Sequence, residues 1–152
     1  EIKGVFNNIT VIDDFAQHPT AVRETIQAIR NKYPKAKLWA LFEAKSNTSR
    51  MRIFQKDYVE AFKNANEVVL AKPYKKKDNL TPAQQIDIPL LCSDLKQIGI
   101  AAHHLPEYEQ IAQFVAEHAK PGDIILGMSG SSFGVVHNRI LDLLALGVAH
   151  SG

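Results

Sequence analysis

Residues 12–30 read IDDFAQHPTAVRETIQAIR, and this stretch indicates the junction between a strand and a helix. Asp13 and Asp14 follow the apolar end of a predicted buried strand. His18 then precedes Pro19, which suits the first helical position because its missing N–H would have no partner there. An apolar helix face follows at Val22, Ile26 and Ile29. We therefore expect carboxylates and an imidazole at the carboxyl end of a strand, where open α/β sheets bind ligands.

Strand and helix signals alternate along the rest of the chain. Strands are predicted at residues 37–42, 67–71, 100–105 and 124–128. Apolar helix faces are predicted from Phe54, Tyr58, Ala61 and Phe62; from Leu91, Leu95 and Ile98; from Tyr108, Ile111, Ala112 and Val115; and from Val136, Ile140, Leu143 and Leu144. Polar residues 72–87 are predicted to form a long loop or a short insertion. This alternation predicts an α/β domain with a mainly parallel sheet and helices on both faces.

The composition is that of one globular domain. The chain has 152 residues, a formal charge of +2 and one cysteine. A charge this small does not call for a nucleic-acid partner, and no apolar run approaches the roughly 18 residues of a membrane span. Cys92 is expected to be a buried, inert thiol, which suits a reducing cytoplasm. Because the chain starts at EIKG without Met and shows no signal peptide, we expect a domain excised from a longer protein.

The acidic pair and His18 each admit two interpretations. Asp13 and Asp14 are either a solvated pair that caps the following helix, or carboxylates that accept hydrogen bonds from ribose hydroxyls or hold a cation. Two adjacent carboxylates need a partner, because like charges at close range raise one pKa. His18 is either the N-cap of the helix or a ligand contact at the mouth of the strand.

The segment FEAKSNTSRMR, residues 42–52, follows the second predicted strand directly. It combines cations with short hydrogen-bonding side chains. Because a guanidinium fork binds a carboxylate through two parallel hydrogen bonds, the segment suits a carboxylate-rich ligand. The alternative is an ordinary polar loop that caps the next helix. The cations are Lys45, Arg50 and Arg52, and the short hydrogen-bonding side chains are Ser46, Asn47 and Thr48.

The segment GMSGSSFGVVHNR, residues 127–139, leads from the last predicted strand into the last helix. Its glycines do not match G-x-G-x-x-G, and the chain contains no G-x-x-x-x-G-K-[ST]. A dinucleotide site or a stand-alone ATP site is therefore not supported. What remains is a turn of small residues, which is either a capped tight turn or a set of N–H groups that could approach an anion.

The other polar residues have simpler interpretations. Residues 75–77 are three lysines and are predicted to lie in a solvated loop. His103 and His104 have no partner at metal-ligand spacing, so a structural or surface role is expected. His118 and His137 are predicted to lie on helix surfaces. We predict no metal site in this chain.

Three segments together resemble the C-terminal domain of the Mur ligases. DDFAQHPTA, residues 13–21, resembles the family segment D-D-[FY]-x-H-H-P-T. SNTSR, residues 46–50, resembles R-S-N-T-M in the branch of the family that adds a tripeptide. GMSGSSFGVVHNRILDLL, residues 127–144, resembles M-S-N-G-x-F-G-G-[IL]-H of the same branch. The three landmarks stand in the family's order and span nearly the whole chain.

This resemblance implies a three-layer Rossmann-like sandwich in an ATP-dependent, amide-forming ligase of bacterial peptidoglycan recycling. The expected substrates are UDP-N-acetylmuramate and the murein tripeptide L-Ala-γ-D-Glu-meso-diaminopimelate. ATP would phosphorylate the muramate carboxylate, and the tripeptide amine would attack the acyl phosphate. The domain would close over a central ATPase domain of the same polypeptide, which mainly holds Mg²⁺. Because the central ATPase and UDP-binding domains are absent here, we expect the isolated domain to be inactive and to retain neither ATP nor Mg²⁺.

The resemblance also implies roles for individual residues. Asp14 would contact the ATP ribose, and His18 would lie near the γ-phosphate or acyl phosphate as the catalytic residue. The incoming peptide would be bound by Lys45, Ser46, Asn47, Thr48, Arg50, Ser129, Gly130 and Phe133. Two positions depart from the family pattern: Gln17 stands where His is usual, and Lys45 where Arg is usual. Two further departures from the branch pattern are Ser49 and Ser131.

Two other functions compete with the tripeptide ligase. The first is a Mur ligase that adds a single amino acid, such as L-alanine, to UDP-N-acetylmuramate. The second belongs to a different class and is a non-catalytic α/β module that binds a ligand. A phosphate-binding loop upstream of Glu1 in the longer protein would favour a ligase over such a module.

Overall fold

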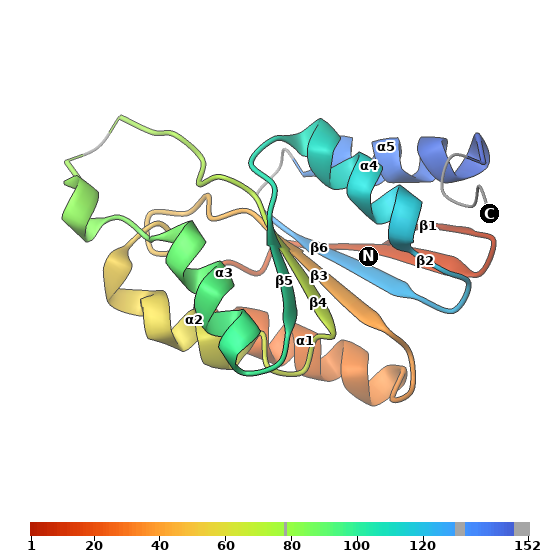
Figure 1. Cartoon of the computed structure of the whole chain (residues 1–152), viewed down its shortest axis with the longest axis horizontal. Helices are drawn as coiled ribbons and strands as arrows, with labels where there is room; N and C mark the ends of the chain where they lie inside the picture. The colour runs from red at the N-terminus through yellow and green to blue at the C-terminus, as the bar shows by residue number, and fades with distance from the viewer. Residues whose placement is uncertain (78, 130–132, 148–152) are drawn as a thin grey trace.

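The computed structural model describes residues 1–77, 79–129 and 133–147 (Figure 1). From residue 9 onward, strands and helices alternate along the described chain at the predicted places. The strands are β1 (Ile2–Phe6), β2 (Ile9–Asp14), β3 (Leu38–Phe42), β4 (Glu67–Leu70), β5 (Ala101–His104) and β6 (Ile124–Met128). The helices are α1 (Pro19–Lys32), α2 (Gln55–Ala61), α3 (Ile88–Gln97), α4 (Tyr108–His118) and α5 (Gly134–Ala145), with short 3₁₀ helices η1 (Arg52–Phe54) and η2 (Pro82–Gln84).

The strands form one mixed sheet in the order β1-β2-β6-β3-β4-β5. β1 runs antiparallel to β2, and all the other neighbouring pairs are parallel. From β3 the chain moves outward to β4 and β5, and then returns through α4 to place β6 between β2 and β3. The strand order therefore reverses between β3 and β6. In open α/β sheets such a switch point leaves a crevice at the carboxyl ends of the strands.

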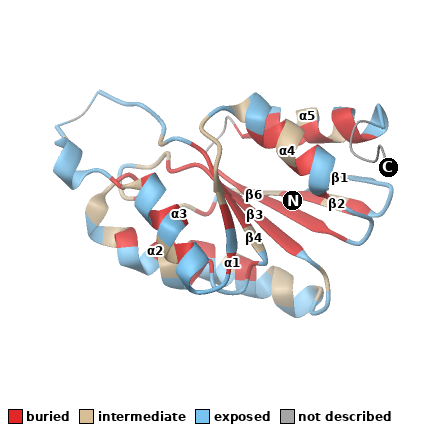
Figure 2. Ribbon diagram, viewed as in Figure 1, coloured by how far each residue is buried: buried red, intermediate tan, exposed pale blue. Residues whose placement is uncertain are grey.

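Helices cover both faces of the sheet, which explains why its central strands are apolar on both sides. Helices α1, α2 and α3 pack on one face, and α4 and α5 pack on the other (Figure 1). In β3, Phe42 and alternate residues before it join the first core, whereas Trp39 and Leu41 join the second. Figure 2 shows the strands at the centre of the sheet as buried along their length. The predicted α/β fold, with a mainly parallel sheet between two helical layers, is confirmed.

The first strand, β1, has no counterpart among the sequence-based predictions. Its side chains are mostly exposed, so the pattern of a buried face is missing from the sequence. The turn that follows it does carry a signal. Asn7 and Asn8 have φ angles of 51° and 60°, which suits a two-residue hairpin whose twist matches that of the strands. Edge strands with little burial escape prediction from hydrophobic alternation for this reason.

The helices begin and end at residues that the sequence marks. His18 is the N-cap of α1, and its Nδ1 accepts a 3.2 Å hydrogen bond from the N–H of Thr20. Asp87 caps α3 by accepting a 3.0 Å bond from the N–H of Leu90. After α3, Gly99 adopts a φ of 89°, which favours glycine. In the described part of the chain, no helix combines the length and apolar character needed to cross a membrane.

Candidate functional site

The register of the parallel strands brings their carboxyl ends level at one edge of the sheet. Asp14 of β2 and Phe42 of β3 both pair with Met128 of β6. Leu70 of β4 pairs with Phe42, and His104 of β5 pairs with Leu70. The loops that follow β2 and β3, and the start of the segment after β6, therefore meet at this edge. These are the three segments that the sequence singles out.

Glu43 is a buried carboxylate at the switch point, and the sequence analysis did not single it out. It follows β3 directly, and only 3% of its surface is exposed. Its Oε1 accepts a 2.6 Å hydrogen bond from Ser129 Oγ, and its Oε2 accepts a bond from the Tyr108 hydroxyl. Burying a charge is costly unless hydrogen bonds replace water. The three side chains therefore link β3, β6 and α4 across the crevice. An acid inside the apolar run LFEA was the available sequence signal.

Asp14 and His18 lie on the loop between β2 and α1 at the same edge. Asp14 Oδ1 accepts a 2.9 Å bond from the N–H of Ala16, and Oδ2 accepts none among the described residues. His18 is exposed, and the bond that its Nδ1 accepts leaves the proton of the neutral ring on Nε2. Each residue therefore keeps one hydrogen-bonding atom available to a ligand. The described chain contains no group of three or more His, Cys, Asp or Glu side chains placed to hold a metal ion.

The prediction that His137 lies on a helix surface is wrong. Its ring is fully buried between α5 and the sheet, and its Nε2 lies 3.1 Å from Asp13 Oδ1. Gly127 makes room for the ring, since a Cβ there would lie 1.9 Å from His137 Cε1. Burial lowers the pKa of His137, against the opposing attraction of Asp13. Asp13 is thus held by its contact with His137. Of the two acids, Asp14 is the one with an oxygen available to a ligand.

His118 and His103 lie where the sequence predicts. His118 is exposed on α4, and His103 has a structural role because its Nε2 lies 2.9 Å from Glu67 Oε2. Cys92 is buried, and burial raises the pKa of its thiol. The lysines at residues 75–77 are exposed in the long loop.

Residues 45–50 form a compact turn beside the β2–α1 loop. Ser46 Oγ accepts a 3.0 Å bond from the N–H of Ser49 and donates to Ser49 Oγ at 2.9 Å. Ser46 therefore supports the turn itself. Thr48 is half-buried, and Asn47 at the tip is exposed. Among these polar residues, Asn47 is thus the most accessible to a ligand.

Cations from two loops gather next to this turn. Arg50 is only 6% exposed, and its Nη2 donates a 3.2 Å bond to Asn47 Oδ1. Lys76 Nζ lies 3.5 Å from the same oxygen. Lys45 Nζ lies 4.6 Å from the centre of the Tyr74 ring, which is a cation–π contact between the loops. The turn after β3 and the long loop after β4 therefore form one basic surface.

Several hollows open along this basic surface, and two of them share residues 72–75 in their linings. One of about 480 Å³ is lined by Arg50, Lys72, Pro73, Tyr74, Lys75, Lys76 and Gln85. The other, of about 510 Å³, is lined by Glu43, Lys72, Pro73, Tyr74, Lys75, Pro106, Glu107, Tyr108 and Glu109. The first has only basic residues among its charged lining groups, whereas the second combines lysines with glutamates. Together they can accept a ligand that carries carboxylates and an amine.

The predicted residues after β6 are less accessible than those of the other segments. Ser129 is fully buried and donates to Glu43. Phe133 is also fully buried, and its ring packs against those of Tyr108 and His137. Gly130 and Ser131 lie outside the described residues. The structure thus brings together Asp14, His18 and residues 45–50, while Ser129 and Phe133 lie in the interior.

The chain belongs to the Mur ligase family. The sequence profile of the family described as Mur ligase, glutamate ligase domain, matches residues 1–131. This matched range covers the sheet edge with Asp14 and His18, the basic loops and strand β6. The chain is accordingly the C-terminal domain of a Mur ligase.

Two kinds of Mur ligase are among the relatives of this chain. The UDP-N-acetylmuramate–L-alanyl-γ-D-glutamyl-meso-2,6-diaminoheptandioate ligase of Escherichia coli K12 is 36% identical over 146 residues, which cover 95% of this chain. The UDP-N-acetylmuramate–L-alanine ligase of Clostridium botulinum strain Langeland is 33% identical over 143 residues. The match spans only 30% of the length of either relative. A crystallised domain from a Haemophilus ducreyi ligase named for the same tripeptide superposes with a TM-score of 0.72 at 30% identity, covering 95% of this chain and 98% of that one.

Proposed function

We propose that this chain is the C-terminal domain of an ATP-dependent ligase that joins the murein tripeptide L-Ala-γ-D-Glu-meso-diaminopimelate to UDP-N-acetylmuramate. One observation carries the proposal: the basic loops with their hollows lie at the same edge of the sheet as Asp14 and His18, and the N–H groups of Lys45 and Ser46 donate to Gln17 Oε1 of the β2–α1 loop. The 36% identity to the tripeptide-adding relative supports it. The complete reaction belongs to the longer polypeptide, because the match spans 30% of such a ligase.

In this proposal the β2–α1 loop serves the nucleotide. Asp14 Oδ2 accepts hydrogen bonds from ribose hydroxyls. The Nε2–H of His18 donates to an oxygen of the phosphate or acyl phosphate, and the positive end of the α1 dipole supports the same negative charge. The structure fits these roles because both atoms are available while the rest of each side chain is held by the fold.

The basic surface serves the incoming peptide. A tripeptide that ends in diaminopimelate carries several carboxylates and one additional amine. Arg50 and the lysines of the long loop suit the carboxylates, because charged hydrogen bonds of this kind are the strong ones. Glu107 and Glu109, which line the mixed hollow, suit the amine. Ser129 and Phe133 would support this pocket from the interior, and Gly130 would complete it.

A Mur ligase that adds L-alanine is the second candidate, favoured by the 33% identity to the Clostridium botulinum enzyme. L-Alanine has one carboxylate and one amine. Its recognition therefore requires far fewer cations than the number that line the two hollows. A non-catalytic ligand-binding module is the third candidate, and the absence of catalysis in the complete polypeptide would support it.

The deciding experiment uses the complete polypeptide with ATP, UDP-N-acetylmuramate and either the tripeptide or L-alanine. Mass spectrometry identifies the amide product, and ADP release gives the rates. We expect kcat/KM for the tripeptide to exceed that for L-alanine by about 100-fold or more, because paired charges left unsatisfied by the wrong substrate are costly. A preference for L-alanine would establish the second candidate. No product with either amine, and no ADP release, would favour the binding module.

The isolated 152-residue domain is expected to be inactive in the same assay. It has no G-x-x-x-x-G-K-[ST] loop to hold the phosphates of ATP. The measurement is ATP-dependent product formation by the purified domain beside the complete polypeptide. Ligation by the domain alone would refute the division of labour proposed here.

A further inference from the structure

Gln17 connects the two loops of the proposed site through its side-chain oxygen. Oε1 accepts hydrogen bonds from the N–H of Lys45 at 2.8 Å and from the N–H of Ser46 at 3.0 Å. It also lies 3.0 Å from Ser49 Oγ, which donates to it. The start and the middle of the basic turn are therefore attached to a single atom of the β2–α1 loop.

The other polar atoms of Gln17 are used as well. Nε2 donates to the carbonyl of Glu43 at 3.0 Å and to that of Ala16 at 3.2 Å. The backbone carbonyl of Gln17 accepts a 2.6 Å bond from the Tyr58 hydroxyl. Burial raises the pKa of Tyr58, so this hydroxyl remains a donor at neutral pH. Gln17 is thus held on both sides, between α2 and the end of β3.

An amide suits the partners at this position, where the family segment usually has His. It supplies an acceptor oxygen and two donor hydrogens, whereas an ionised carboxylate only accepts and a neutral imidazole has one donor and one acceptor. Replacement by alanine would leave the N–H groups of Lys45 and Ser46 without their partner. A polar group that loses its partner in a half-buried site costs more than the bond itself contributes.

We infer that Gln17 is a positioning residue for the peptide-binding loop, residues 45–50. It sets the distance between His18, its direct neighbour in the chain, and the turn that carries Arg50. The inference rests on the proposed function, because the ligand of the loop is the acidic peptide named there. Gln17 acts through the loop and does not itself contact the peptide.

Amide hydrogen exchange on the 152-residue chain, followed by NMR, tests the structural part without any substrate. In Gln17→Ala, the amides of Lys45 and Ser46 are expected to exchange about tenfold faster or more, since about 1.4 kcal/mol corresponds to tenfold. Gln27→Ala is the matched control. Gln27 lies on α1 and also uses both ends of its amide, with Asn31 and Asn64, but away from the loop.

Kinetics of the complete polypeptide test the functional part. Gln17→Ala is expected to raise the KM for the tripeptide about tenfold and to change the KM for ATP less than about twofold. Gln17→His is expected to rescue part of the loss, because an imidazole provides one of the acceptors or donors. Gln27→Ala is expected to leave both KM values unchanged.

The outcomes separate the two levels of the inference. Unchanged exchange at Lys45 and Ser46 in Gln17→Ala would overturn the role of Gln17. Faster exchange with an unchanged peptide KM would overturn the link between the loop and the peptide. A parent polypeptide that uses no peptide at all would contradict the proposed function, while the exchange data would still decide whether Gln17 holds the loop.

Discussion

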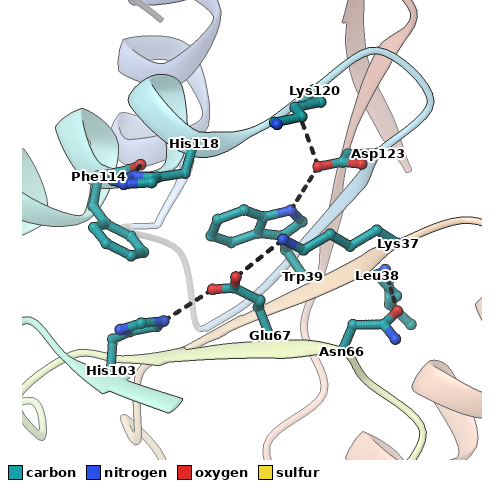
Figure 3. A network of polar contacts seen from close by, with 10 residues as sticks. All are labelled: Lys37, Leu38, Trp39, Asn66, Glu67, His103, Phe114, His118, Lys120 and Asp123. Carbon is teal, nitrogen blue, oxygen red and sulfur yellow. Dashed lines mark hydrogen bonds and ion pairs between the residues drawn. The ribbon is translucent and has the colours of Figure 1, made fainter. Parts of the chain in front are cut away.

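The two ends of the parallel strands both carry polar clusters, yet they differ in how those groups are used. At the amino-terminal end, Glu67 Oε1 accepts a 3.0 Å bond from Lys37 Nζ, and Glu67 Oε2 lies 2.9 Å from His103 Nε2 (Figure 3). Asp123 Oδ2 accepts a 2.9 Å bond from the indole N–H of Trp39. These charged groups already have partners in neighbouring strands, so they stabilise the fold.

Aromatic packing closes the amino-terminal end further. The ring of Phe114 lies 4.5 Å from that of His103 and 4.4 Å from that of His118, measured between centroids. Trp39 packs edge-on against the same phenylalanine at 6.0 Å. Figure 3 shows these rings beside the ion pairs. The aromatic rings surround the charged groups with apolar contacts. The cluster therefore connects the strands to α4.

The carboxyl end contains similar residue types, but some of their hydrogen-bonding atoms have no partner among the described residues. Asp14 and His18 each retain an available atom, and two hollows of about 480 and 510 Å³ border the basic loops. In the interior of this end, both oxygens of Glu43 accept hydrogen bonds, and at its surface Glu107 and Glu109 form ion pairs with Lys72 and Arg139. Residue type alone therefore does not identify a ligand-binding site. A site keeps hydrogen-bonding capacity for a ligand, and the fold holds the rest of the side chain in place.

The tightest packing at the carboxyl end gives the largest expected effect. Gly127→Ala would place a Cβ 1.9 Å from His137 Cε1, so the ring must move and overpacking should cost about 3 kcal/mol. Chemical unfolding of the purified chain measures this loss. Gly134→Ala is the control, since no described atom lies within 4 Å of a Cβ there. Equal stability of the two variants would show that His137 is not packed as described.

The next largest effect concerns the basic surface. Arg50→Ala in the complete polypeptide should weaken tripeptide binding by about 2 kcal/mol, because a desolvated charge pair loses one partner. This corresponds to a peptide KM about 30-fold higher, with little change in the KM for ATP. Lys63→Ala serves as the control, because it removes an exposed cation that lies just after α2 and forms an ion pair with Glu60 of that helix. Equal losses for ATP and peptide would indicate a general structural role.

Asp14→Ala tests the nucleotide side of the comparison. A charge-assisted hydrogen bond contributes about 1.5–3 kcal/mol, so the KM for ATP should rise about tenfold or more. Asp14→Asn keeps an oxygen that can accept from the N–H of Ala16 and should lose less. Steady-state kinetics with saturating peptide provide the measurement. An unchanged KM for ATP in the folded variant would mean that the available oxygen of Asp14 does not bind the nucleotide.

The smallest effect is expected at the amino-terminal end. Glu67→Gln should lower the free energy of unfolding by about 1 kcal/mol, because the hydrogen bonds to Lys37 and His103 lose their charge. The KM values of the complete polypeptide should stay unchanged. Thermal unfolding and kinetics on the same preparation check both statements. A kinetic effect without a loss of stability would contradict the division between a structural end and a functional end.

Local patterns predicted most of the fold and part of the site. The strand end at residues 9–14, the helix opened by His18 and the polar loop after β3 all lie within short windows with clear periodicity or capping signals. Glu43 and His137 were missed for a common reason, since their partners lie far away in the chain. Ser129 is 86 positions from Glu43, and Asp13 is 124 positions from His137. The spacing of His137 from Phe133 and Ile140 matches a buried helix face. A polar residue at such a position does not indicate by itself whether its side chain is buried or which residue it contacts.

Local sequence patterns were sufficient to predict the alternation of strands and helices, the two-sided burial of the central strands and the polar segments at one edge of the sheet. These features depend on local periodicity and on the rule that parallel strands end together. Long-range contacts of the fold determine that Asp13 contacts His137, that Asp14 keeps an available oxygen and that Gln17 holds the basic loop. These outcomes depend on the insertion of β6 between β2 and β3, which fixes long-range register and side-chain partners that no short segment encodes.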